Sequence, residues 1–187
     1  LITISLISMI PNIMAQALSV EKTKELIIQT QKFHDSMDKM TVTEIANLTY
    51  PALYTSRGSK EEFTKQLEMM KNHHLKKGGF KVIKSELGKP SKIIIMGDEE
   101  VVFIPRICSL DQGESILKKE TYAIAIRSKA KGGAWYFIDG DFFGPDPKSM
   151  FGLLTALPKD TKLPHKNSER IKKDDKTNKT KKTNKIE

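Results

Sequence analysis

Apolar residues in the first half of the chain recur at steps of three and four, the spacing of one helix face. Between residues 19 and 40 this stripe consists of Leu26, Thr30, Phe33, Met37 and Met40. A short second helix is expected over 41–48, and Pro51 limits it because the residue before a proline avoids the helical region. Ser59 and Glu62 have the spacing of a capping box. They predict a third long helix that ends at Gly78-Gly79.

From residue 80 the hydrophobic period changes to two, as in strands. Strands are predicted over 80–86, 92–96, 100–107, 115–128 and 134–142. Gly97-Asp98 suits a tight hairpin, and Pro105 is expected to reduce the end of the third strand to an edge or a bulge. Helices followed by an antiparallel meander of about five strands indicate the α+β class.

The last predicted strand is apolar on both faces. Trp135 and Phe137 lie on one face, and Tyr136 and Ile138 lie on the other. A sheet of this kind packs something on each side. We expect a helix on one face, and a partner subunit or another element on the other.

The N-terminus has the pattern of a secretory signal. Residues 1–10 carry no charge, and Ala15-Gln16-Ala17 places small residues where signal peptidase needs them. The run is too short for a membrane-spanning helix, and Pro11 interrupts it. We expect a signal remnant over 1–17, cleavage after Ala17, and export to the periplasm or the medium.

The C-terminal end carries most of the charge. The 187-residue chain has a net charge of +9, and residues 159–187 hold eleven Lys or Arg against five Asp or Glu. This segment has no aromatic residue and only three large aliphatic ones, Leu163, Ile171 and Ile186. Such a composition predicts a disordered basic tail. The three expected parts are therefore the signal remnant, an α+β domain over 18–158, and the tail.

Three helices followed by a closing aromatic strand resemble a known superfamily. The resemblance rests on Pro51-Ala52-Leu53-Tyr54, on Arg57-Gly58-Ser59 and on Trp135-Tyr136-Phe137-Ile138-Asp139-Gly140. These features are similar to the nuclear transport factor two-like superfamily, also called SnoaL-like or cystatin-like, over roughly residues 21–143. The resemblance implies a strongly curved sheet wrapped around the helices as a cone, with a pocket in its mouth. Members include ketosteroid isomerase, dehydratases, polyketide cyclases, transport factors and exported proteins without catalysis, so the fold alone does not fix the function.

Seven residues are candidates for lining such a pocket. They are His34, Tyr50, Tyr54, Arg106, Tyr122, Trp135 and Asp139. Each also has an ordinary structural interpretation. His34 also fits a partly exposed helix residue, Arg106 a solvent-facing strand position, and the tyrosines the edge of a core with one end wet.

One alternative gives the pocket a catalytic role. A carboxylate in an apolar pocket has a raised pKa, which suits Asp139 as a general base near neutral pH. Tyr54 or Tyr122 would then stabilise a developing oxyanion. The competing interpretation is that Asp139-Gly140-Asp141 simply ends the strand in a turn.

Metal and cysteine chemistry find little support in the sequence. The chain has a single cysteine, Cys108, which is expected to be a small buried hydrophobe. His73 and His74 are adjacent, so on a helix they point in different directions and cannot share one metal. No metal site and no cofactor are expected.

The expected function is that of an exported small-ligand-binding or protein-interaction module without catalysis. One alternative is a cofactor-independent isomerase, dehydratase or cyclase acting on a small apolar substrate. Another is an envelope-adhering protein that uses its cationic tail. The partners considered are a small apolar or anionic ligand, a second copy of the chain on the open sheet face, and an anionic polymer or lipid. Specific nucleic-acid binding is not expected, because the tail lacks interleaved aromatic residues.

Overall fold

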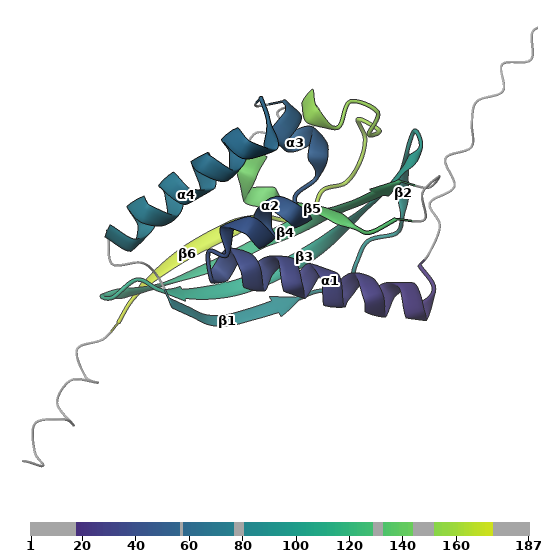
Figure 1. Ribbon diagram of the computed structural model, residues 1–187. Coiled ribbons are helices and arrows are strands. Elements are labelled where there is room, and N and C mark those ends of the chain that lie inside the picture. The colour runs from purple at the N-terminus through teal and green to yellow at the C-terminus, as the bar shows by residue number, and fades with distance from the viewer. Residues whose placement is uncertain (1–17, 57, 77–80, 129–132, 144–151, 174–187) are drawn as a thin grey trace, which may run out of the picture.

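The computed structural model describes residues 18–56, 58–76, 81–128, 133–143 and 152–173. The predicted signal remnant at 1–17 and the last part of the predicted tail, 174–187, lie outside these residues. Within them the chain forms four α-helices and a six-stranded sheet (Figure 1). The predicted α+β class is confirmed.

The three predicted helices are present, with a short one between the second and the last. The helices are α1 (Val20–Asp38), α2 (Val42–Leu48), α3 (Pro51–Thr55) and α4 (Lys60–Lys76). Ser19 caps α1 by accepting a hydrogen bond from the Lys22 amide at 3.3 Å, and Ser59 accepts one from the Glu62 amide at 3.2 Å. Pro51 ends the preceding segment as expected, but it also begins α3, since a proline at the first helical position has no amide to satisfy.

Every strand pair in the sheet is antiparallel. The strands are β1 (Lys81–Leu87), β2 (Ile94–Met96), β3 (Glu99–Asp111), β4 (Ser115–Ser128), β5 (Tyr136–Asp139) and β6 (Asn167–Lys172). β3 and β4 form a long central hairpin; β1 and β2 pair with the outer edge of β3, and β5 and β6 with the outer edge of β4. The sheet is open, and the cone shape implied by the resemblance stays a prediction.

Pro105 lies inside β3 rather than at its end, so the prediction that it weakens the end of this strand was wrong. Its carbonyl accepts a hydrogen bond from the Gly88 amide at 2.7 Å, on the side where β1 and β2 lie. The N–H and C=O of one strand residue point to the same side. The missing N–H therefore removes no bond between β3 and β4, and the strand continues.

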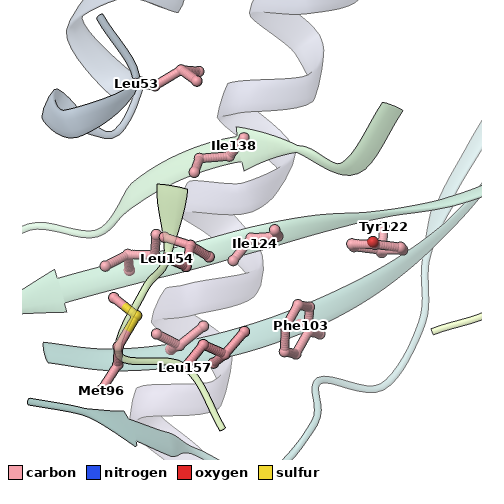
Figure 2. Close-up of a cluster of buried hydrophobic side chains, with 10 residues drawn as sticks. Leu53, Met96, Phe103, Tyr122, Ile124, Ile138, Leu154 and Leu157 are labelled. Atoms are coloured by element: carbon pink, nitrogen blue, oxygen red, sulfur yellow. The ribbon is translucent and has the colours of Figure 1, made fainter. Parts of the chain in front are cut away.

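Two apolar layers cover the two faces of the sheet. On one face α1 packs through Leu26 and Phe33 against Val102 and Ile104 of β3 and against β5. On the other face Leu154 and Leu157 belong to a buried cluster shown in Figure 2, and Leu163 packs against it. The sheet members of this cluster are Met96, Val101, Phe103, Tyr122, Ile124, Ile126 and Ile138. Another element of the same chain therefore covers the face for which a partner subunit was the alternative.

The predicted disordered tail is wrong for its first half. β6 lies within it and pairs with residues 115–120 of β4, with Ile171 opposite Ile116. The few aliphatic side chains of this segment are placed on existing apolar surface, and β4 supplies the missing hydrogen-bond partners. A segment too polar to form its own core can still fold by adding a strand to an edge.

Candidate functional site

A cavity of about 550 Å³ lies between the helices and one face of the sheet. Most of its wall is apolar, and the larger apolar side chains there are Phe33, Met37, Met40, Ile45, Leu53, Phe63, Leu67, Met70, Leu110, Phe137, Ile138 and Phe142. They come from all four helices, from the sheet and from the 3₁₀ turn η1 (Gly140–Phe143). A pocket of this volume suits a small organic molecule.

The position of α4 creates the cavity. Phe63 and Leu67 are buried against Val42, Ile45 and Ala46 of α2, so α4 is attached to the other helices. One turn further on, Met70 also lines the cavity, yet its side chain is 61% exposed. α4 therefore forms the wall opposite the sheet, and the cavity is the space between them.

The sheet side of the cavity contains a polar patch. Arg106 and Cys108 come from β3, and Lys119 and Thr121 come from β4. Arg106 pairs with Thr121 and Cys108 with Lys119 in the strand register. Alternate residues of neighbouring strands share a face, so these four side chains form one patch.

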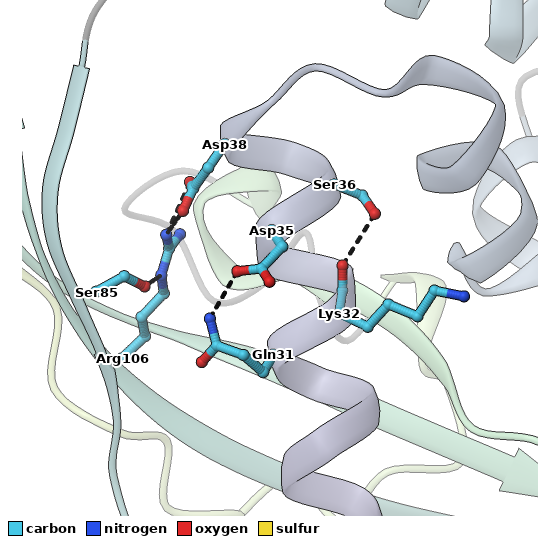
Figure 3. Close-up of polar contacts among 7 residues, drawn as sticks. All are labelled: Gln31, Lys32, Asp35, Ser36, Asp38, Ser85 and Arg106. Atoms are coloured by element: carbon cyan, nitrogen blue, oxygen red, sulfur yellow. Dashed lines mark hydrogen bonds and ion pairs between the residues drawn. The ribbon is translucent and has the colours of Figure 1, made fainter.

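Arg106 is held rigidly in this patch. Its Nη2 donates to both carboxylate oxygens of Asp38 at 2.7 and 2.8 Å, and its Nε donates to Ser85 Oγ at 3.0 Å (Figure 3). The Arg106 side chain is only 6% exposed and the Asp38 side chain 17%. This ion pair fixes the C-terminal end of α1 to the sheet and places two charges in the cavity wall.

A second ion pair lies at the end of β5. Lys119 pairs with Asp141, which also accepts a hydrogen bond from Thr121 Oγ1 at 3.0 Å. The Asp141 amide donates to Asp139 Oδ1 at 2.8 Å. This bond is the turn predicted as the ordinary interpretation of Asp139-Gly140-Asp141, and it orients Asp139 along the cavity wall.

Asp139 is half-buried and lines the cavity. Burial raises the pKa of this carboxyl above its ordinary value, and the negative charge of Asp141 raises it further. The Asp141 amide, Arg106 and Lys119 act in the opposite direction, with less effect. Asp139 thus combines the turn and the pocket interpretations.

His34 is fully buried between α1 and the sheet and does not line the cavity, so the partly exposed helix position considered for it was wrong. Neither ring nitrogen has a hydrogen-bond partner in the described part of the chain. Burial, together with the nearby Arg106 charge, lowers the pKa of this imidazole from 6.5 to about 3. His34 is therefore a neutral core residue.

The aromatic candidates all lie outside this cavity. Tyr50 donates to Glu99 at 2.8 Å, and Tyr54 packs beside Phe63 with ring centroids 6.2 Å apart. Tyr122 is buried on the opposite face of the sheet, edge-on to Phe103 (Figure 2). Trp135 is buried under α1.

Of the seven predicted pocket residues, only Arg106 and Asp139 line the cavity. The prediction missed Asp38, Lys119 and Thr121. Asp38 lies one turn after His34 on the inward helix stripe, and the alternation of β4 places Lys119 and Thr121 on the face of Ala123 and Ala125. These signals were available in the sequence, but only the strand register shows that they meet.

The described residues contain no group of three or more His, Cys, Asp or Glu side chains that could hold a metal ion. Among the same residues, no helix is long and apolar enough to cross a membrane.

Comparison with family models, curated proteins and solved structures found no match to this chain. The site is therefore interpreted from its own geometry.

Proposed function

We propose that this protein binds a small amphipathic molecule in the cavity between α4 and the sheet. The observation that carries the proposal is the cavity itself, about 550 Å³ in volume with apolar walls and a polar patch on one side. Apolar walls favour a ligand through the surface they remove from water. A few fixed polar groups set its orientation.

The same geometry favours binding over proton-transfer catalysis. In the catalytic alternative Asp139 needs a tyrosine hydroxyl beside it in the cavity. Tyr122 lies on the other face of the sheet, and Tyr54 packs against Phe63. Without that donor a developing oxyanion has no tyrosine partner at this wall.

Export is part of the proposal. The expected cleavage after Ala17 would leave Leu18 as the first residue, and Leu18 packs against the core under α1. Ser19 caps α1 directly after it. Cleavage at this position would leave α1 and every other described element in place, which is compatible with export.

The experiment compares two neighbouring methionines of α4. Met69 and Met70 are 64% and 61% exposed, but only Met70 lines the cavity. In Met70→Glu a carboxylate of similar size enters the apolar wall. A naphthylamine dye whose fluorescence rises in apolar surroundings is titrated into both variants and the wild type.

We expect the wild type and the matched control Met69→Glu to bind the dye equally. Met70→Glu should bind it about tenfold more weakly, because the charged Glu side chain replaces an apolar contact between residue 70 and the dye. Equal binding by all three proteins, or no binding by the wild type, would overturn the proposal.

A further inference from the structure

The charged groups of the cavity wall do not balance. Among the described residues that line it, Arg106 and Lys119 are the permanently cationic side chains, and Asp38, Asp139 and Asp141 are the carboxylates. A partly buried carboxylate without an ion-pair partner is unfavourable unless another positive charge compensates it.

Two of the carboxylates already have basic partners. Asp38 receives both its hydrogen bonds from Arg106, whose side chain is almost completely buried. Asp141 is paired with Lys119 across the end of β4. Each of the two cations therefore has a carboxylate partner of its own in an ion pair.

Among the described residues, Asp139 is the carboxylate of this wall that forms no ion pair. Its Oδ1 accepts the Asp141 amide, while its Oδ2 accepts no hydrogen bond from the described residues. Part of the Asp139 surface is accessible, because this residue is only half-buried. Asp139 lines the cavity.

We propose that the ligand of this cavity is an apolar amine, whose ammonium group pairs with Asp139 while its hydrocarbon part lies against α4. This inference rests on the proposed function and names the chemical class of the ligand. An ammonium would supply the missing positive charge and donate to Oδ2, which a carboxylate ligand cannot do. Phe137 and Phe142, which flank Asp139 in the chain, line the same wall and suit the carbon atoms next to the amine.

The test compares three ligands that share one hydrocarbon chain. Octylammonium, octanol and octanoate are competed against the naphthylamine dye on the full 187-residue chain at low salt and pH 7. We expect octylammonium to bind at least about tenfold more tightly than octanol, and octanoate most weakly. This comparison on the wild type requires no variant to fold.

The second arm removes the charge of Asp139 alone. In Asp139→Asn the amide oxygen can still accept from the Asp141 amide, so the turn is preserved. The preference for octylammonium over octanol should fall to within about twofold in this variant. Asp98→Asn is the matched control, because Asp98 is exposed in the β2–β3 hairpin and does not line the cavity. It should keep the full preference.

The outcomes separate the two proposals. If octanol or octanoate displaces the dye as well as octylammonium does, the proposal of an amine ligand is refuted while the cavity remains a binding site. The same conclusion follows if Asp139→Asn still binds octylammonium more tightly than octanol. If none of the three ligands displaces the dye and Met70→Glu has no effect on it, the binding function itself is refuted.

Discussion

At the scale of single residues, the burial of His34 carries an energetic cost. It is fully buried, and neither of its ring nitrogens has a partner among the described residues. A neutral imidazole carries one N–H donor and one acceptor nitrogen, and both lose their water on folding. The favourable part of its burial is packing against Phe33, with ring centroids 5.5 Å apart.

The first prediction is that His34→Leu stabilises the protein. The substitution places an apolar side chain in the same space and removes two polar atoms that have no partner among the described residues. The free energy of unfolding at pH 7 should rise by about 1 kcal/mol, which urea denaturation measures. His73→Leu makes the same chemical change at an exposed position of α4 and should give no gain.

The pH dependence of stability follows from the same residue. The pKa of His34 is about 3 in the folded protein and 6.5 when unperturbed, so the unfolded chain binds a proton that the native state refuses. Stability is therefore fully present above pH 6.5 and is lost as the pH falls toward 3. By pH 5 this site should cost the wild type about 2 kcal/mol, and His34→Leu should not show that loss. An identical pH dependence in both proteins would contradict the assignment.

Residue-scale prediction from the sequence worked where a local pattern decides the role. Asp139 was recognised as a turn residue near an aromatic strand, and Arg106 as an inward arginine candidate. The position next to Phe33 makes His34 a pocket candidate. Whether an inward helix residue lines a cavity or belongs to a packed core depends on the residues of other elements that face it. For His34 these include Arg106 of β3, and their proximity cannot be read from the sequence.

At the scale of elements, the junction of β5 and η1 determines where Asp139 lies. Gly140 follows it and passes very close to β4. A Cβ atom on residue 140 would come within 2.7 Å of the Tyr122 carbonyl oxygen and 2.8 Å of its ring. Only a residue without a side chain fits there.

The second prediction is that Gly140→Ala destabilises the fold by about 1–3 kcal/mol, because Tyr122 is itself buried and cannot give way without moving β4. The midpoint of thermal unfolding checks this. Gly152→Ala is the control, since a Cβ at residue 152 meets nothing within 4 Å and that variant should be as stable as the wild type. Equal midpoints for the two variants would show that η1 can shift without cost.

Element prediction succeeded wherever hydrophobic periodicity and caps agreed. The helices over 19–40 and 41–48 and the strand over 115–128 were placed to within about two residues. β6 was missed because its residues, Asn167–Lys172, are nearly all polar and half of them charged. Its pairing comes from the free edge of β4, which is a property of the sheet rather than of the segment.

At the scale of the whole molecule, the open sheet and helix α4 enclose a cavity between them. The resemblance implies a pocket in the mouth of a cone; the structure has a cavity between the helices and the sheet, and most of the predicted lining residues lie outside it. Cys108, expected to be a small buried hydrophobe, is 3% exposed and lies in the polar part of the wall. It is the only cysteine of the chain and therefore a specific reporter of the cavity.

The last prediction is that cavity ligands protect Cys108 from a small thiol reagent. Burial raises the pKa of this thiol, so little thiolate is present at pH 7 and methyl methanethiosulfonate should react slowly, and faster as the pH rises. Saturating octylammonium should slow the reaction about tenfold or more by excluding the reagent, as single-adduct mass spectra would show.

Protection also arises if the reagent reaches Cys108 only when the protein unfolds, since any ligand suppresses unfolding. His34→Leu separates the two routes, because His34 does not line the cavity and its replacement stabilises the fold without a ligand. Reaction through the cavity should proceed at the wild-type rate in this variant, whereas reaction through unfolding should slow by about the factor by which unfolding becomes rarer. A slower reaction in His34→Leu without ligand would mean that the cavity is closed to molecules of this size.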